Sequence, residues 1–447
     1  MSSRLLTKSQ LFGTTVVVTG ITLAGSALNF LAQATLAYRF GAGAAIDAYS
    51  YAISLPIFLA GLAASVISYT AIPMMAQASE NELRARQIGR SLSAWLMALC
   101  TIIGLLAVPA IYLQPLFVPP SRNILQYPDL GCMIFLAWIA GAIQLLTALT
   151  AAQLNADGRP VIAACLALTI SSGTIAALLL FPHAGIAIAM LGLVGGSAAG
   201  AIAGLFIARS HLLPPRFSHE VRYEMVRLGK STLWAVLALS CFASFFVIDA
   251  IWASRLGEGS LAAMGYAHRL VIGIGGMVVA GPSALFIPRL ARLVAAKDGP
   301  GFRRFLSHAV GLVALIGGAC ALGIALFAPQ IVAILFERGA FDPSDTLLVA
   351  TVLRHMAPGV VTMLISVILL RAIFCLPGLG IASAGLGLLF SLCYFAFSWL
   401  MLDLGVEGLA NSYSLSWTIF ALCNVALILR RSRLDDSRDP SPQGETG

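Results

Sequence analysis

The hydrophobic positions of this chain form long continuous runs, separated by short polar or basic segments. Most runs reach about 18 residues or more, the length that a helix needs to cross about 30 Å of hydrocarbon. They lack the strict apolar–polar alternation of an outer-membrane barrel. Because backbone groups in lipid must be hydrogen-bonded within their own segment, continuous runs indicate helices. The pattern predicts membrane-spanning helices at about residues 12–38, 48–76, 92–113, 131–153, 160–181, 184–208, 231–254, 260–288, 308–328, 346–372, 377–402 and 405–429.

The composition points to the same class of protein. Apolar residues make up 59% of the chain and charged residues 10%, whereas about a quarter of the residues in a soluble domain are charged. A soluble fold of this size would have no place for so much apolar surface. The first run, from Leu11 to Tyr38, is longer than the apolar core of a cleavable signal peptide, so we expect it to be retained as the first spanning helix.

The basic residues lie mostly on one side of the predicted topology. With the N-terminus in the cytoplasm, 21 of the 27 Lys and Arg residues fall in cytoplasmic segments, and only Arg269 and Arg354 lie inside the membrane. Cytoplasmic loops typically carry this excess, so both chain ends are predicted to be cytoplasmic. The net charge of +8 would then face anionic lipid headgroups. We expect no nucleic-acid binding, because no soluble domain offers a basic face with interleaved aromatic residues.

The two halves of the chain resemble each other at an offset of about 215 to 223 residues. Residues 39–43 (RFGAG) match 255–259 (RLGEG), and residues 71–76 (AIPMMA) match 286–291 (FIPRLA). Six helices in each half give both halves the same orientation. We therefore predict an all-α polytopic membrane protein with two six-helix lobes related by a pseudo-twofold along the membrane normal, as in alternating-access transporters. The predicted parts are a lobe at 1–208, a basic linker at 209–230, a lobe at 231–432 and a disordered tail at 433–447.

Several motifs along the chain together resemble one family of membrane proteins. In the first half they are residues 40–49 (FGAGAAIDAY) with Leu55-Pro56, and residues 154–159 (LNADGR). In the second half they are residues 266–270 (YAHRL), 287–291 (IPRLA) and 335–342 (LFERGAFD). These motifs resemble those of the MviN/MurJ-type flippases of the MOP exporter superfamily, which also contains polysaccharide flippases and MATE drug antiporters. The similarity covers roughly residues 10 to 432.

The resemblance implies a function and a set of positions to compare. Members of the family move undecaprenyl-pyrophosphate-linked sugars, notably the peptidoglycan precursor lipid II, to the outer leaflet by rocking two lobes around a cationic cavity. The lipid II flippases carry arginines at positions that match Ser26, Ala32, Ala60 and Gly61 of this chain, and a further arginine that matches Arg269. They also have two C-terminal helices, forming part of a groove for the lipid tail, that have no counterpart in this sequence.

Ionisable side chains inside the membrane are costly, so each one here is a candidate site residue. Arg269 lies nine or ten residues into its helix, near mid-membrane, and its planar guanidinium suits a pyrophosphate. Asp249, on the preceding helix, is a candidate partner of Arg269 in one lobe arrangement, or a ligand for a coupling cation. His268 stands where the family has an acid, and is either a proton-coupling group or a histidine that is simply hydrogen-bonded.

Other polar side chains in or near the predicted helices each have two possible roles. Arg354 and His355 either contact phosphate or sugar, or extend toward the outer headgroups. Asn29 and Gln33 either bind sugar hydroxyls or join helices to one another. Asp47 precedes the second predicted helix, so we interpret it first as the cap of that helix and second as a transport residue.

The sequence offers no chemistry for an enzyme. It contains no G-x-x-x-x-G-K-[ST] phosphate loop and no evident nucleophile–base pair, so we expect neither catalysis nor a cofactor. The eight cysteines lie in or at the edge of apolar runs and form no C-x-x-C pair. We therefore expect no disulfide and no metal site.

The leading hypothesis is a flippase for a polyprenyl-pyrophosphate-linked oligosaccharide, an envelope glycan or peptidoglycan precursor, in the bacterial cytoplasmic membrane. Its expected partners are that glycan, the membrane lipids and enzymes of envelope synthesis. Three alternatives stay open: a lipid II flippase proper, a MATE-like antiporter of organic cations, and a transport-dead scaffold for envelope synthesis. The intramembrane arginines disfavour the antiporter, whose cavity would favour acidic side chains.

Overall fold

The computed structural model of the protein describes residues 8–66, 82–156, 158–208, 233–234, 236–240, 243–296, 298–376 and 379–436. The regular secondary structure of these residues is helical throughout, with no strand. Ten of the described helices are long and apolar enough to cross a membrane. The prediction of an all-α polytopic membrane protein is therefore confirmed.

The helices of the first half follow the predicted spans in order. They are α1 (Lys8–Phe40), α2 (Ala44–Val66), α4 (Glu82–Phe117), the short α5 (Arg122–Leu125), α6 (Leu130–Ala156), α7 (Pro160–Leu180) and α8 (Ala187–Ile207). The helix α4 begins ahead of its predicted start at 92, because a helix continues into polar sequence beyond the hydrocarbon layer. The end of the second predicted span, 67–76, lies outside the described residues.

The second half contains α10 (Ser244–Trp252), a 3-10 turn (Ala253–Arg255), α11 (Ser260–Ala295), α12 (Gly299–Phe336), α13 (Pro343–Cys375), α14 (Gly380–Leu400) and α15 (Gly405–Asp436). The helix α10 covers the C-terminal part of the predicted span 231–254. The helix α15 ends at Asp436, within the tail predicted at 433–447. The linker 209–230 and residues 437–447 lie outside the described residues.

Carboxylates define where two helices of the second half begin. Asp298 accepts a hydrogen bond from the backbone N–H of Gly301 at 2.8 Å, at the start of α12. Asp342 and Asp345 form a reciprocal capping box at the start of α13. The hydroxyl of Ser344 also donates to Asp342, which lowers the pKa of that exposed carboxyl. These bonds satisfy N–H groups that the first helical turn leaves without a partner, so both helices extend past their predicted apolar cores.

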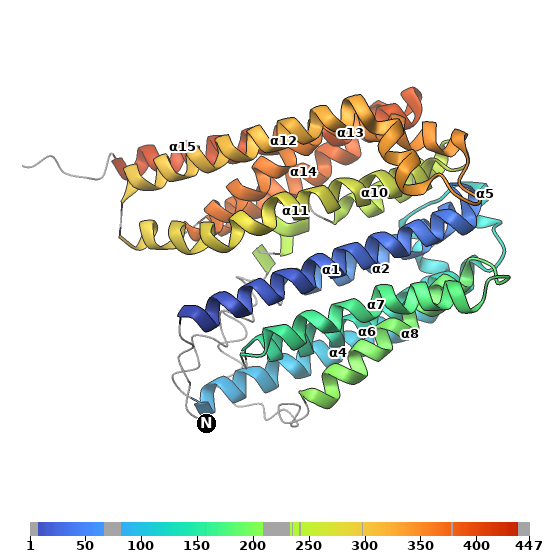
Figure 1. Ribbon diagram of the computed structural model, residues 1–447, viewed down its shortest axis with the longest axis horizontal. Coiled ribbons are helices and arrows are strands. Elements are labelled where there is room, and N and C mark those ends of the chain that lie inside the picture. Colours follow the sequence, from blue (N-terminus) through green and yellow to red (C-terminus); the bar gives the residue numbers. More distant parts are fainter. Residues whose placement is uncertain are drawn as a thin grey trace, which may run out of the picture.

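The helices of the two halves form two groups that face each other. Figure 1 shows α1 and α2 beside α10 and α11 along the middle of the molecule, where α2 packs against α10 and α11, and α1 packs against α11 and α12. The start of α1 and the end of α15 lie at the same end of the molecule. This arrangement agrees with an even number of spans, while the exact lobe boundaries stay a prediction.

Glycines let α7 and α8 approach each other closely. Gly192 and Gly196 of α8 face Gly173 of α7, and a Cβ atom at Gly196 would lie 2.8 Å from the backbone oxygen of Ile170. A Cβ atom at the neighbouring Gly195 would lie in open space. Because lipid tails are as apolar as the helices themselves, close packing of small residues is a main source of helix association in membranes.

We expect Gly196→Ala to lower the thermal unfolding midpoint of the purified protein in detergent. The added methyl group would press on the α7 backbone, and overpacking of this kind costs about 1–3 kcal/mol. Gly195→Ala is the matched control, because it adds the same methyl group where nothing lies within 4 Å. Equal midpoints for the two variants would contradict the packing described for α7 and α8.

Candidate functional site

A cavity of about 440 Å³ lies between helices of the first half of the chain and α11. Its walls come from α1, α2, α6, α7 and α8, and α11 contributes Arg269. Most of the lining is apolar. Its polar residues include Asn29, Gln33, Tyr49, Gln144 and Thr147. The cavity therefore brings together three predicted site residues, Asn29, Gln33 and Arg269, from both halves of the chain.

Arg269 is the one charged side chain among the described residues that line this cavity. It lies nine residues after Ser260, the first residue of α11, which places it about 14 Å along the helix and, in the predicted topology, near mid-membrane. The guanidinium donates a hydrogen bond to the side-chain oxygen of Gln33, across the interface between the halves. No described carboxylate forms an ion pair with it. A guanidinium in apolar surroundings with only a neutral amide as partner favours an anionic ligand.

Small residues surround Arg269 where the family resemblance places further arginines. Ala32, Ala60 and Gly61 all line the cavity, whereas Ser26 is exposed on α1 and lies outside the lining. Three of the four positions compared in the sequence thus converge on one space. The cavity has the location implied by the resemblance, but Arg269 is the one cation among the described residues of its lining.

At the outer end of the predicted topology, each half caps a helix of the other half. The buried carboxylate of Asp47 accepts hydrogen bonds from the backbone N–H groups of Gly259 and Ala262, both at 2.7 Å, at the start of α11. Glu258 accepts a hydrogen bond from the backbone N–H of Ala44 at 2.9 Å, at the start of α2. The interpretation of Asp47 as the cap of its own helix is therefore wrong, because α2 already begins at Ala44 and the side chain reaches the neighbouring helix.

Further hydrogen bonds hold the turn between α1 and α2 against the second half. The backbone N–H of Ala42 donates to Asp345 at 3.0 Å, and the hydroxyl of Tyr266 donates to the carbonyl of Gly41 at 3.0 Å. Gly41 has a φ of 62°, a conformation that favours glycine. The two halves are thus closed against each other at this end of the molecule.

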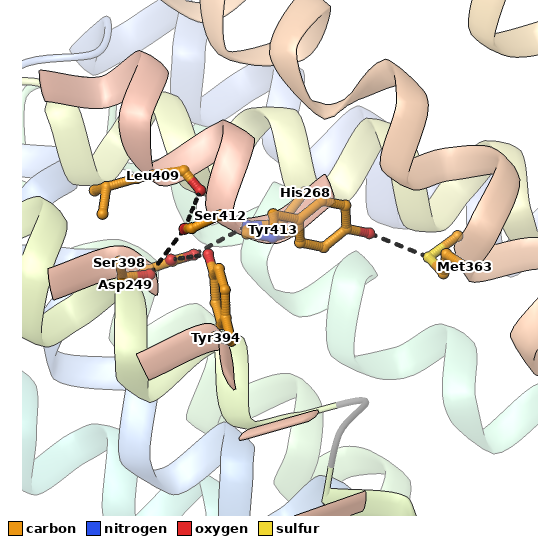
Figure 2. A network of polar contacts seen from close by, with 8 residues as sticks. All are labelled: Asp249, His268, Met363, Tyr394, Ser398, Leu409, Ser412 and Tyr413. Atoms are coloured by element: carbon orange, nitrogen blue, oxygen red, sulfur yellow. Dashed lines mark hydrogen bonds and ion pairs between the residues drawn. The ribbon is translucent and has the colours of Figure 1, made fainter. Parts of the chain in front are cut away.

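Asp249 and His268 lie inside the second half, away from the cavity lining. The hydroxyl of Tyr394 donates to one carboxylate oxygen of Asp249, and the other oxygen lies 3.1 Å from Nδ1 of His268 (Figure 2). The expected pair of Asp249 with Arg269 is not formed in this structure. His268 and Arg269 are consecutive on α11, so their side chains leave the helix about 100° apart, one toward α10 and the other into the cavity.

Arg354 and His355 also lie outside the cavity lining. Arg354 is exposed and donates to the carbonyl of Ala325 on α12 at 3.1 Å. His355 is half-buried, and its Nε2 lies 3.9 Å from a carboxylate oxygen of Glu407 on α15. The structure does not bring these two predicted site residues to Arg269.

Two residues of these sites were missed by sequence reasoning. Glu258, which caps α2, lies in the repeat segment 255–259 directly before a helix, so an acid at that place was an available signal. Tyr49 lines the cavity but occupies an ordinary position in an apolar helix, and nothing in the sequence distinguishes it.

Comparison with known proteins adds independent evidence. The family model of the lipid II flippase MurJ matches residues 36–439. A probable lipid II flippase MurJ of Haemophilus influenzae is 24% identical over 438 residues, covering 90% of this chain and 83% of the relative.

Two solved structures share the fold. A lipid II flippase MurJ in an inward closed conformation has a TM-score of 0.76 and 17% identity, covering 94% of this chain and 89% of that one. An inward-facing MATE family multidrug resistance transporter of the MOP superfamily has a TM-score of 0.75 and 13% identity, covering 95% and 100%. Because the family model spans most of the sequence, the chain belongs to the lipid II flippase MurJ family.

Proposed function

We propose that this protein moves a polyprenyl-pyrophosphate-linked glycan from the cytoplasmic to the outer leaflet of the bacterial cytoplasmic membrane. Membership of the lipid II flippase MurJ family supports the transport of a lipid-linked precursor. The observation that carries the proposal is Arg269, a guanidinium near mid-membrane that has no carboxylate partner among the described residues.

A pyrophosphate is the chemical group that such a site suits. Anionic groups cross hydrocarbon at a high cost unless a fixed cation and hydrogen-bond donors replace their water. A guanidinium offers paired N–H donors in one plane, which match phosphate oxygens. The amides of Asn29 and Gln144 in the same lining suit sugar hydroxyls next to the phosphates.

The closure at the outer end of the predicted topology supports transport by alternating access. Asp47 and Glu258 hold the halves together there, on the side opposite to the start of α1 and the end of α15. With both chain ends in the cytoplasm, as the basic residues predict, the substrate would enter from the cytoplasmic side. Release to the outside then requires the bonds of Asp47 and Glu258 to open. We propose no catalytic step.

The cavity does not favour a MATE-like transport of organic cations, although the fold is shared with a MATE family transporter. A cation placed beside Arg269 would meet a like charge in apolar surroundings, which is strongly unfavourable. Lipid II is the first glycan to test, because the family is named for it. Partner enzymes of envelope synthesis remain proposed partners.

We expect Arg269→Ala to weaken the retention of a lipid-linked pyrophosphate glycan by about 10- to 100-fold, because hydrogen bonds to charged groups contribute about 1.5–3 kcal/mol. Native mass spectrometry of the protein with added lipid II measures this retention, and transfer of lipid II in proteoliposomes measures transport. Arg354→Ala is the matched control, since it removes the same charge outside the cavity. If Arg269→Ala binds and transports like the unchanged protein, the site is assigned wrongly.

We expect Asp47→Asn to open the outer end. An amide presents one acceptor oxygen where the carboxylate accepts from two backbone N–H groups, and the loss of one charge-assisted bond shifts the equilibrium by roughly tenfold. The measurement is the labelling rate of a cysteine at buried Ala42 by a membrane-impermeant thiol reagent added outside, after replacement of the native cysteines.

Asp298→Asn is the control for the Asp47 experiment. Asp298 also caps a helix with its carboxylate, but it accepts from the backbone N–H of Gly301 at the start of α12, within the second half. Its substitution should leave the labelling of residue 42 unchanged. Equal effects of both substitutions would show that the labelling reports helix fraying rather than separation of the halves.

A further inference from the structure

A second cavity, of about 320 Å³, lies between α2 of the first half and α10 and α14 of the second half. The helix α10 packs against both of the other helices. The lining consists of apolar side chains, among them Phe58, Val247 and Leu392, and two serines. Because Ser244 and Ser391 hydrogen-bond to each other at 3.0 Å, the described side chains suit a hydrocarbon chain rather than a sugar or an ion. We call this space the apolar groove.

The apolar groove is open toward the surrounding lipid. Leu388, Leu392 and Phe395 line it from α14 and are 43%, 67% and 42% exposed. Along its opposite wall α10 rises about 12 Å from Ser244 to Trp252, slightly less than the depth of one hydrocarbon leaflet, about 15 Å. The helix α10 ends at the closed end of the molecule, so in the predicted topology the groove has the depth and position of a chain in the outer leaflet.

A cation stands where the headgroup of such a lipid would lie. The guanidinium of Arg255 is 4.7 Å from the ring of Trp252, and that ring contacts Phe395 of the groove at a centroid distance of 5.2 Å. Arg255 is exposed, and no carboxylate of the described residues pairs with it. The indole N–H of Trp252 is buried and has no hydrogen-bond partner, which is rare in proteins. The end of the groove therefore offers a positive charge and a spare donor.

The internal repeat shows that this arginine is not needed for structure in the way that its counterpart is. Arg39 occupies the matching position of the first half. Its guanidinium donates to four backbone carbonyls at and beyond the end of α7, at 2.6 to 3.1 Å. Arg255 forms no such bonds with the described residues. The same motif thus has a structural arginine in one half and an available arginine in the other.

The chemistry of the two parts points to one kind of lipid. A guanidinium pairs well with a phosphate, and phosphatidylglycerol carries a phosphodiester whose charge nothing in its own headgroup offsets. Phosphatidylcholine has the same phosphate next to a fixed cation, so Arg255 favours it less. The polyprenyl chain of the proposed substrate is longer than one leaflet is deep, and its pyrophosphate is assigned to Arg269 in the other cavity. A bilayer lipid is therefore the better occupant.

Both halves of the molecule form the walls of the apolar groove. Phe58 belongs to the first half, and Val247 and Leu392 belong to the second. A separation of the halves at the closed end would change the spacing of α2 and α10, and with it the shape of the groove. A ligand that fits between both halves favours the arrangement in which it fits.

We propose that the apolar groove and Arg255 form a binding site for phosphatidylglycerol of the outer leaflet, and that the bound lipid favours the outer-closed arrangement. One acyl chain lies between α2, α10 and α14, and the phosphate lies at Arg255. This inference goes beyond the proposed function and does not depend on the identity of the transported molecule.

Binding is tested by native mass spectrometry of the delipidated full-length protein in detergent. The protein is titrated with phosphatidylglycerol and with phosphatidylcholine of the same acyl chains. We expect saturable binding that prefers phosphatidylglycerol, and Arg255→Ala should lower this preference by about fivefold. Arg122→Ala is the matched control, because it removes another exposed arginine at the same end of the molecule, outside the groove.

The position of the chain is tested by filling the apolar groove. Leu388→Trp places a larger side chain in the lining and should weaken the binding of both lipids. Leu389→Trp is the matched control, because the neighbouring leucine is similarly exposed, at 37%, but lies outside the lining. Phosphatidylglycerol with a diazirine in one acyl chain should label α10 and α14, and Leu388→Trp should reduce this labelling.

The effect on closure is tested with the cysteine reporter at residue 42, in nanodiscs of phosphatidylcholine with and without phosphatidylglycerol. We expect phosphatidylglycerol to slow the labelling, by at most the factor with which it prefers the closed arrangement. Arg255→Ala should label at the same rate in both membranes, whereas Arg122→Ala should keep the difference.

The outcomes distinguish the parts of the inference. Equal binding of the two lipids, binding that never saturates, or a preference that survives Arg255→Ala would overturn the site. Lipid II with a diazirine in its polyprenyl chain that labels α10 and α14 would assign the groove to the substrate and also overturn it. Bound phosphatidylglycerol that leaves the labelling of residue 42 unchanged would overturn the effect on closure. A protein that transfers no lipid-linked glycan but passes these tests would overturn the proposed function alone.

Discussion

The exchange of capping carboxylates between the halves is the interaction on which the rest of the structure depends. The first backbone N–H groups of α2 and α11 have no partner within their helices, and at the end of the molecule opposite to the start of α1 and the end of α15 each helix finds one in the opposite half, through Asp47 and Glu258. Neither inner helix is therefore complete without the other half. When the end opens, water can satisfy the same groups, so the closure is specific without making opening prohibitively costly.

The helix α11 connects this closure to the rest of the molecule. Its first turn receives Asp47, Tyr266 donates to the turn before α2, and His268 and Arg269 follow in the next turns. A rigid helix transmits a rotation over such a short distance without loss. The cavity, the buried pair of Asp249 and His268, and the closed end of the molecule are therefore all contacted by this single helix.

The sequence was informative where the membrane itself restricts the fold. Apolar length gave the order of the helices, and the cost of buried charge selected Arg269, which the structure places in the cavity with Asn29 and Gln33. The sequence could not tell which way a side chain leaves a helix that is apolar on nearly all sides. For that reason Asp249 was expected as a partner of Arg269 in one lobe arrangement, whereas in this structure it contacts His268, and Asp47 was assigned to its own helix instead of α11. Both differences concern rotation about a helix axis, which tertiary packing decides.

A single arginine in the cavity has a consequence for the energetics of transport. A pyrophosphate diester carries a negative charge on each phosphate, so under the proposed function a loaded cavity with Arg269 as its one described cation would keep a net negative charge, whereas the empty cavity would be positive. With the cytoplasm negative, the loaded cavity is driven outward and the empty one inward, by about 2.3 kcal/mol per elementary charge and 100 mV. Further arginines at Ala32, Ala60 or Gly61 would cancel the charge of the loaded state and remove the first of these driving forces. The small residues that surround Arg269 therefore suit a cycle in which both half-reactions run with the membrane potential.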